Sequence, residues 1–191
     1  MSHLARAACL ASVLVAAVFT VGCAGVAPNY APSIDNVQSL KQSGAQPAKV
    51  GAVVVQADIP GGKSIGLRAS SISSPVGENY GDYIATALRQ ELELAKLLDP
   101  QSGVEISGTL LRNNIDAGGF STNSGQIEAR FLVKRAGQLR FDKVKRIEHS
   151  WESSFAGAVA IPRAANNYPV MVQKLIGTLV ADPDFIQSLQ K

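Results

Sequence analysis

The sequence predicts an α+β domain in which a mixed, mostly antiparallel sheet carries two main helices packed on one face. Three patterns support this fold: stretches with alternating apolar and polar residues, two longer stretches with apolar residues at helical spacing, and Gly, Pro, Asn and Ser clusters between them. The chain has 191 residues, of which 46% are hydrophobic. We therefore predict one domain over residues 49–191, with the element order β-β-α-β-β-β-α.

Two strands and a helix are predicted in the first half of this domain. A β-branched run in residues 49–59 indicates a buried strand, which the Pro-Gly-Gly at 60–62 ends. Residues 65–69 alternate and suggest its partner strand. The clearest helix lies in 79–98, and its apolar stripe is formed by Ile84, Leu88, Leu92 and Ala95.

Three strands and a helix are predicted in the second half. Alternation indicates strands in 104–110 and 127–133, separated by a Gly/Ser/Asn loop, and a return strand in 139–155 whose broken alternation suggests a bulge. The last helix is predicted to begin near Asn167, with Pro169 in its first turn. Its apolar face is formed by Val172, Leu175, Ile176 and Leu179.

The N-terminal 22 residues have the order of a secretory signal. Arg6 provides a positive charge, residues 10–21 form an uncharged apolar run, and small residues lead up to Cys23. A retained membrane anchor is the alternative, but this run would rise only about 18 Å as a helix, and a hydrocarbon core is about 30 Å thick. We predict that residues 1–22 are removed, so that Cys23 is the only cysteine of the mature chain, because Cys9 lies in the removed segment.

Gly22 and Cys23 resemble the end of a bacterial lipoprotein signal sequence. In that family, the cysteine after a small residue is acylated and the chain is cut just before it. Thr20 departs from the family pattern, in which Leu is usual at that position. By the sorting rule of the family, Ala24 after the cysteine implies transfer to the outer membrane. The resemblance thus implies a domain that faces the periplasm and is held by acyl chains on Cys23; a retained anchor and a plain cleaved signal are the alternatives.

Residues 23–48 are predicted to be the acylated cysteine followed by a flexible tether. This stretch is rich in Pro, Gly, Ser, Gln and Asn, so it buries little apolar surface. Such a tether would span on the order of 25–30 Å. Ile34, Val37 and Leu40 recur every third residue, and the alternative is that they form a helical turn laid on the domain.

No pattern in the sequence predicts catalysis, a cofactor or a metal. The Gly-Gly-Lys-Ser at 61–64 has Ala57 where a phosphate-binding loop needs Gly, and a strand is predicted after it instead of a helix. His149 is the one histidine after Cys23, and no Gly-x-Ser-x-Gly motif accompanies it. With one histidine and an acylated cysteine, a zinc site would have to be built from carboxylates alone, which does not match the usual Cys and His ligands of zinc. We therefore predict that the protein is not an enzyme.

Asn113, Asn114 and Asp116 are a possible ligand set for a hard cation. They lie where the strand that begins at Val104 is expected to run out into the loop 117–125. Asn and Asp are also common turn residues, and turn formation is the favoured explanation.

A basic stretch covers residues 134–146. Contact with anionic lipid headgroups or with a partner protein is one interpretation, and a charged hairpin that prevents edge-to-edge strand pairing is the favoured alternative. The net charge of +3 is too small to indicate nucleic-acid binding. The candidate contact residues are Arg140, Lys143, Lys145 and Arg146.

The segments Val104–Leu110 and Ala181–Ile186 are similar to those of small envelope lipoproteins of the YajG type. This resemblance implies location and fold, and it transfers no functional residue. We expect a non-enzymatic, lipid-anchored envelope protein that binds an envelope protein partner or supports envelope assembly. The alternative is an accessory lipoprotein that contacts lipid or lipopolysaccharide during envelope transport, for which a lipid-sized apolar cavity would be the sign.

Overall fold

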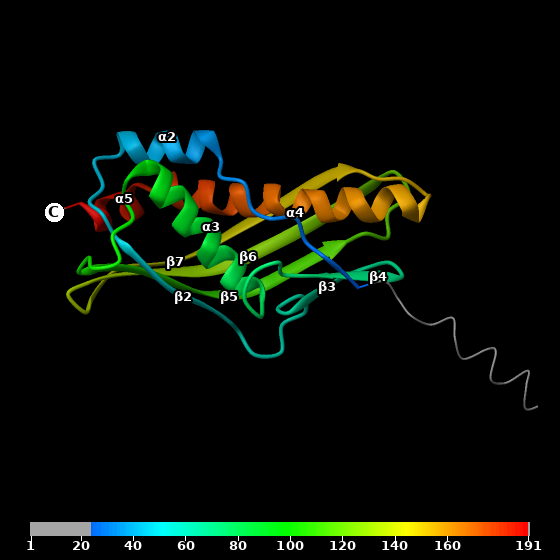
Figure 1. The fold of residues 1–191 in the computed structure, drawn as a ribbon, viewed down its shortest axis with the longest axis horizontal. Coiled ribbons are helices and arrows are strands. Elements are labelled where there is room, and N and C mark those ends of the chain that lie inside the picture. Colours follow the sequence, from blue (N-terminus) through cyan, green and yellow to red (C-terminus); the bar gives the residue numbers. More distant parts are fainter. Residues whose placement is uncertain (1–23, 191) are drawn as a thin grey trace, which may run out of the picture.

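The computed structural model describes residues 24–190, which form two mixed sheets and four helices (Figure 1). The larger sheet has the strand order β2-β5-β6-β7. Only β2 and β5 are parallel in this sheet, so the predicted α+β class with a mostly antiparallel sheet is confirmed. Its strands are β2 (Lys49–Val55), β5 (Val104–Asp116), β6 (Thr122–Arg135) and β7 (Gln138–Glu152).

A second, smaller sheet has the order β1-β4-β3, which the sequence did not reveal. β3 and β4 form a hairpin, and β1 pairs with β4 in parallel. β3 confirms the strand predicted at 65–69, but it pairs with β4 and not with the strand that begins at Lys49. β1 and β4 are too short for a visible alternation, and β4 buries only Ile72. The strands of this sheet are β1 (Ala24–Val26), β3 (Ser64–Leu67) and β4 (Ser70–Ser73).

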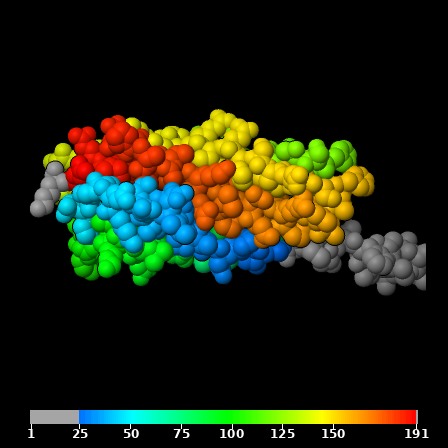
Figure 2. Space-filling view, turned by 90° about the horizontal axis from the view of Figure 1, so that it is seen from above, coloured from blue at the N-terminus to red at the C-terminus, as the bar shows by residue number. Residues whose placement is uncertain are grey.

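The helices lie together on one face of the larger sheet (Figure 1). Seen from above, α4 lies lengthwise beside α2 (Figure 2). The inward residues of β5 and β6 alternate with partly exposed ones, and Ile106, Ile127 and Phe131 are fully buried. The core therefore sits between this sheet face and the helices α2 (Ile34–Gln42), α3 (Tyr80–Ala95), α4 (Gly157–Val180) and α5 (Pro183–Leu189).

Residues 24–48 differ from the predicted tether, because they contain β1 and α2 and pack on the domain. Val37 and Leu40 are 9% and 1% exposed, so the alternative of a helical turn laid on the domain is confirmed for these two residues, whereas Ile34 is 82% exposed. The Ser33 hydroxyl caps α2 by accepting from the Asn36 amide at 3.4 Å. In addition, the Gln173 side chain on α4 donates to the Ala31 carbonyl at 2.7 Å.

α4 begins ten residues before the predicted start, at Gly157 instead of near Asn167. Its first turns bury Ala160 and Ala164, which continue the apolar stripe with side chains too small to stand out in the sequence. Both Pro162 and Pro169 lie inside the helix. Each proline removes one backbone donor, and the buried stripe outweighs that loss.

β5 also continues beyond its predicted end, through Asn113 to Asp116. Asn113 is fully buried on the helix-facing side, where its amide nitrogen donates to the Gly61 carbonyl at 2.7 Å. The predicted loop 117–125 is correspondingly shorter, because β6 begins at Thr122.

Replacing Tyr168 by alanine is expected to reduce the free energy of unfolding by about 3–5 kcal/mol, the usual cost of deleting a buried aromatic ring. The fully buried Tyr168 ring packs against those of Tyr80 and Tyr83, with centroids 4.6 and 5.2 Å away. Leu139→Ala is the control, because Leu139 is 53% exposed and should cost about 0.5 kcal/mol or less. Urea unfolding measures both, and equal losses would contradict this packing.

Candidate functional site

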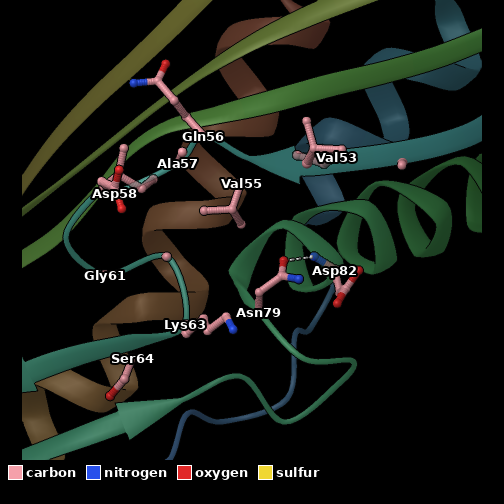
Figure 3. Close-up of a pocket in the computed structure, with 14 residues that line it drawn as sticks. Val53, Val55, Gln56, Ala57, Asp58, Gly61, Lys63, Ser64, Asn79 and Asp82 are labelled. Atoms are coloured by element: carbon pink, nitrogen blue, oxygen red, sulfur yellow. Dashed lines mark hydrogen bonds between the residues drawn. The ribbon is translucent and has the colours of Figure 1, made fainter.

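A surface pocket of about 650 Å³ lies between the end of β2, the loop 56–63 and the start of α3 (Figure 3). Val55 and Ile59 provide apolar lining, and the charged lining side chains are Asp58, Lys63 and Asp82. The pocket thus combines apolar lining residues with charges of both signs, a lining suited to a polar or peptide ligand.

The start of α3 fixes one wall of this pocket. The Asn79 side-chain oxygen accepts from the Gly81 and Asp82 amides at 2.8 and 3.1 Å and caps the helix. The Asp82 carboxylate accepts from the Glu78 amide at 2.9 Å. Figure 3 shows the Lys63 side chain directed toward this helix start.

The loop 56–63 forms the opposite wall and is pinned to β5. Gly61 has a φ of +75°, and a Cβ there would lie 1.7 Å from the Asn113 carbonyl oxygen. Only glycine fits such a close approach. The residue after the loop, Ser64, begins β3, so the predicted strand in place of a phosphate-loop helix is confirmed.

Glu91 on α3 is a fully buried carboxylate that the sequence analysis missed. Its Oε1 accepts from the Tyr30 hydroxyl, the backbone amide of Ser33 (3.2 Å) and the side-chain nitrogen of Asn36 (3.1 Å). Its Oε2 has no hydrogen-bond partner within the described chain. Burial raises the pKa of Glu91, and these hydrogen bonds oppose the increase.

The environment of Glu91 indicates a structural role. All three donors belong to residues 30–36, so the carboxylate ties the N-terminal segment to α3. The sequence contains a pattern that indicates the burial of Glu91, because position 91 is seven residues after Ile84 and falls on the apolar stripe of α3.

His149 lies on the helix-facing side of β7 and binds α4 through both ring nitrogens. Nδ1 lies 2.8 Å from the Lys174 ammonium, and Nε2 lies 3.1 Å from the Asn167 side-chain oxygen. Burial lowers the pKa of His149, and the Lys174 charge lowers it further. A neutral imidazole with a proton on Nε2 satisfies both contacts, so His149 joins β7 to α4.

The proposed cation ligands do not converge. Strand alternation places Asn113 on the helix-facing side of β5 and directs Asn114 and Asp116 to the opposite face. All three lie within the strand, so the favoured turn explanation does not hold for Asn113 and Asn114. Across residues 24–190, no group of three or more His, Cys, Asp or Glu side chains is arranged to hold a metal ion.

The structure divides the basic stretch between the two faces of β7. The Lys143 ammonium lies 2.9 Å from Asp182 and 2.6 Å from Asp184, and Lys145 lies 2.5 Å from Asp182. Arg146 is exposed on the face away from the helices, whereas the exposed Arg140 lies at an irregularity in β7 and lines a surface pocket with residues of α5. Two of the four predicted contact residues are therefore paired with acids, and contact with an anionic surface stays a prediction for the two arginines.

Asp182→Ala is expected to lower the free energy of unfolding by about 2 kcal/mol, roughly half from the lost cap of α5 and half from the lost ion pairs. The carboxylate accepts from the Asp184 amide at 2.9 Å. Burial favours its neutral form, yet the hydrogen bonds from Lys145 and Lys143 hold the pKa of Asp182 below its usual range.

Asp182→Asn is the matched control, because asparagine also caps helices but carries no charge. A lowered folded-state pKa stabilises the fold above the unfolded-state pKa of about 3.9, and this stabilisation is lost as the pH falls through the folded value. Urea unfolding should therefore show that the free energies of unfolding of wild type and Asp182→Asn differ less at pH 3 than at pH 7. A difference that is independent of pH would contradict the ion pairs.

The sequence matches no protein-family model, and comparison with curated proteins finds no match. Among solved structures, protein XCC0632 of Xanthomonas campestris, assigned to the family model DUF330, is similar with a TM-score of 0.55. The two chains are 11% identical, and the match covers 86% of this chain and 95% of the other. This likeness shows a shared fold.

A second solved structure, of a protein from Caulobacter crescentus CB15 provisionally described as a lipoprotein, matches with a TM-score of 0.44. It is 11% identical, and the match covers 78% of this chain and 93% of that one. The resemblance to YajG-type lipoproteins stays a prediction from the sequence.

Proposed function

We propose that the chain is a lipoprotein of the bacterial outer membrane, anchored through Cys23, whose periplasm-facing domain binds another envelope component and catalyses no reaction. One observation carries the proposal: β1, the first strand of the described residues, starts at Ala24, directly after Cys23. Cys23 itself lies outside the described residues. An acyl anchor there is therefore contiguous with the fold, and it holds the domain against the membrane surface.

The hydrogen bonds of the first residues support this close attachment. β1 pairs with β4, and the Ala27 amide then donates to the Ser73 carbonyl at 2.9 Å. The Tyr83 hydroxyl donates to the Pro28 carbonyl at 2.9 Å. Across residues 24–190, no helix combines the length and apolar character needed to cross a membrane.

A binding role is supported by the pocket beside β2. Its lining mixes valines with Asp58, Lys63 and Asp82, which favours a protein segment over a lipid tail. A non-catalytic role is supported by His149, whose two ring nitrogens are engaged by Lys174 and Asn167. Lipid contact during transport is the alternative function.

A photo-crosslinking residue in place of Lys63, in the full chain in cells, tests the binding role. Lys63 is exposed at the pocket, and Leu139 is an exposed control position in the β6–β7 hairpin. We expect one protein to be captured from position 63 and not from position 139. Capture of lipid alone would support the transport alternative, and identical capture from both positions would contradict a binding role for this pocket.

A further inference from the structure

Two phenylalanines are exposed at one end of the molecule. Phe120 is 71% exposed and Phe155 is 79% exposed, and their rings stack with centroids 5.5 Å apart and an interplanar angle of 20°. All four tyrosines of the chain, in contrast, are buried. A stacked aromatic pair that is left in water is costly, so a partner that removes it from water is expected.

Arg68 holds together the two loops that carry this pair, residues 117–121 and 153–156. It lies at the turn of the β3–β4 hairpin with a φ of +54°, and its guanidinium reaches across to both loops. The Ser153 amide also joins the loops by donating to the Ser121 carbonyl at 2.8 Å. The guanidinium donates at 2.6–2.9 Å to the carbonyl oxygens of Ala117, Gly119, Ser154 and Phe155. The aromatic pair is therefore presented on a fixed support.

The same end of the molecule carries the attachment point of Cys23. Ala24, which is joined to Cys23 by a peptide bond, pairs with Ser71, three residues after Arg68. Neighbouring strands lie about 4.8 Å apart. In Figure 1, β1, the β3–β4 hairpin and the start of α4 occupy the right-hand end, and in Figure 2 the loop that contains Phe120 is found there too.

We propose that Phe120 and Phe155 insert into the interfacial region of the bilayer to which Cys23 is anchored, and that they fix the orientation of the domain. This inference rests on the proposed lipid anchor. The position of Cys23 identifies the bilayer as the partner that covers the two rings. Acyl chains on Cys23 bring the bilayer surface to the end of the fold where the aromatic rings are exposed. Aromatic rings are favoured in the interfacial region of a bilayer.

This orientation has a consequence for the basic stretch. The β6–β7 turn, at Ala136 and Gly137, lies at the opposite end of the molecule (Figure 1). With the aromatic pair on the bilayer, Arg140 points away from the membrane that holds the anchor. Arg140 then faces the periplasm, where a partner can reach it.

An environment-sensitive dye on Ser121→Cys tests this orientation in the full, acylated protein, reconstituted in vesicles of phosphatidylethanolamine and phosphatidylglycerol. Acylation leaves Cys23 without a free thiol, so the dye labels only the introduced cysteine. Gln138→Cys at the far turn is the control position. We expect a lipid-borne headgroup quencher to quench the dye at 121 several-fold more than the dye at 138.

A second comparison isolates the two phenylalanines. Phe120→Ser with Phe155→Ser should reduce the quenching at 121 several-fold, while Val54→Ser with Leu139→Ser, which changes exposed residues elsewhere, should leave it unchanged. Thermal unfolding confirms that each variant is folded.

Co-flotation with the vesicles separates the two proposals. If the protein co-floats and the dye at 121 stays in water, or if both positions are quenched equally, the orientation is wrong and the anchor stands. If the protein made with its native signal sequence does not co-float, the proposal of a lipid anchor is wrong. The orientation, which depends on that anchor, is then overturned as well.

Discussion

Replacing Cys23 by alanine is expected to move the protein from the membrane fraction to the soluble fraction almost completely. Acylation adds about 0.8 kcal/mol per buried CH₂, and two or more chains give stable anchoring where one is marginal. The exposed phenylalanines cannot replace the chains, because a fully buried Phe contributes only about 1.5–3 kcal/mol and these rings would be inserted in part. Without the thiol, the contacts of the domain are too weak to keep it bound.

Cys9→Ala is the matched control for this substitution. Cys9 lies in the apolar run of the predicted signal, so its loss should leave both processing and membrane association unchanged. Cell fractionation followed by immunodetection measures both variants. A Cys23→Ala protein that stays with the membranes would show that something other than the cysteine anchors the chain.

Glu91→Ala is expected to reduce the free energy of unfolding by about 3–5 kcal/mol. The substitution leaves the Tyr30 hydroxyl and the Ser33 amide without their acceptor and opens a cavity in a fully buried site. Each unpaired buried group costs about 1–3 kcal/mol. The segment 24–42 should loosen first, and amide hydrogen exchange would show it as an early loss of protection in α2.

Glu91→Gln separates charge from shape, because glutamine keeps the Oε1 acceptor and carries no charge. The folded-state pKa of Glu91 is raised above 4.5, the ordinary pKa of a glutamate. The stabilisation that Glu91 provides is therefore fully present at a pH below about 4.5. This contribution is lost as the pH rises through the folded-state value. Denaturant unfolding should therefore show that the free energy of unfolding of the wild type falls between pH 4 and pH 8. Glu91→Gln should not show this fall. A parallel fall in both proteins would contradict a buried, desolvated carboxylate.

Elements with a strong local pattern could be predicted from the sequence. The strands near 104–110 and 127–133 alternate strictly, and the helix near 79–98 has a complete apolar stripe. The sequence of α2 does not by itself distinguish a docked helix from a flexible segment, because its position depends on contacts such as Tyr30 to Glu91, 61 residues apart. The start of α4 was missed because its buried face begins with alanines.

The candidate sites depend on long-range contacts that a single sequence does not encode visibly. Lys143 appears as a free cation in the sequence, but Asp182, 39 residues later, neutralises it in the fold. Phe120 and Phe155 lie in separate loops, which the β6–β7 pairing, the Ser153–Ser121 hydrogen bond and the Arg68 guanidinium bring together. The pocket beside β2 likewise combines three segments, so its composition emerges only from the fold.

The intact mass of the protein purified from membranes tests the lipid anchor most directly. We predict the mass of a chain that begins at Cys23 and carries added acyl groups, with fragmentation placing those groups on that residue. The mass of a chain that begins at Met1, or of a chain that begins at an unmodified Cys23, would contradict the lipid anchor.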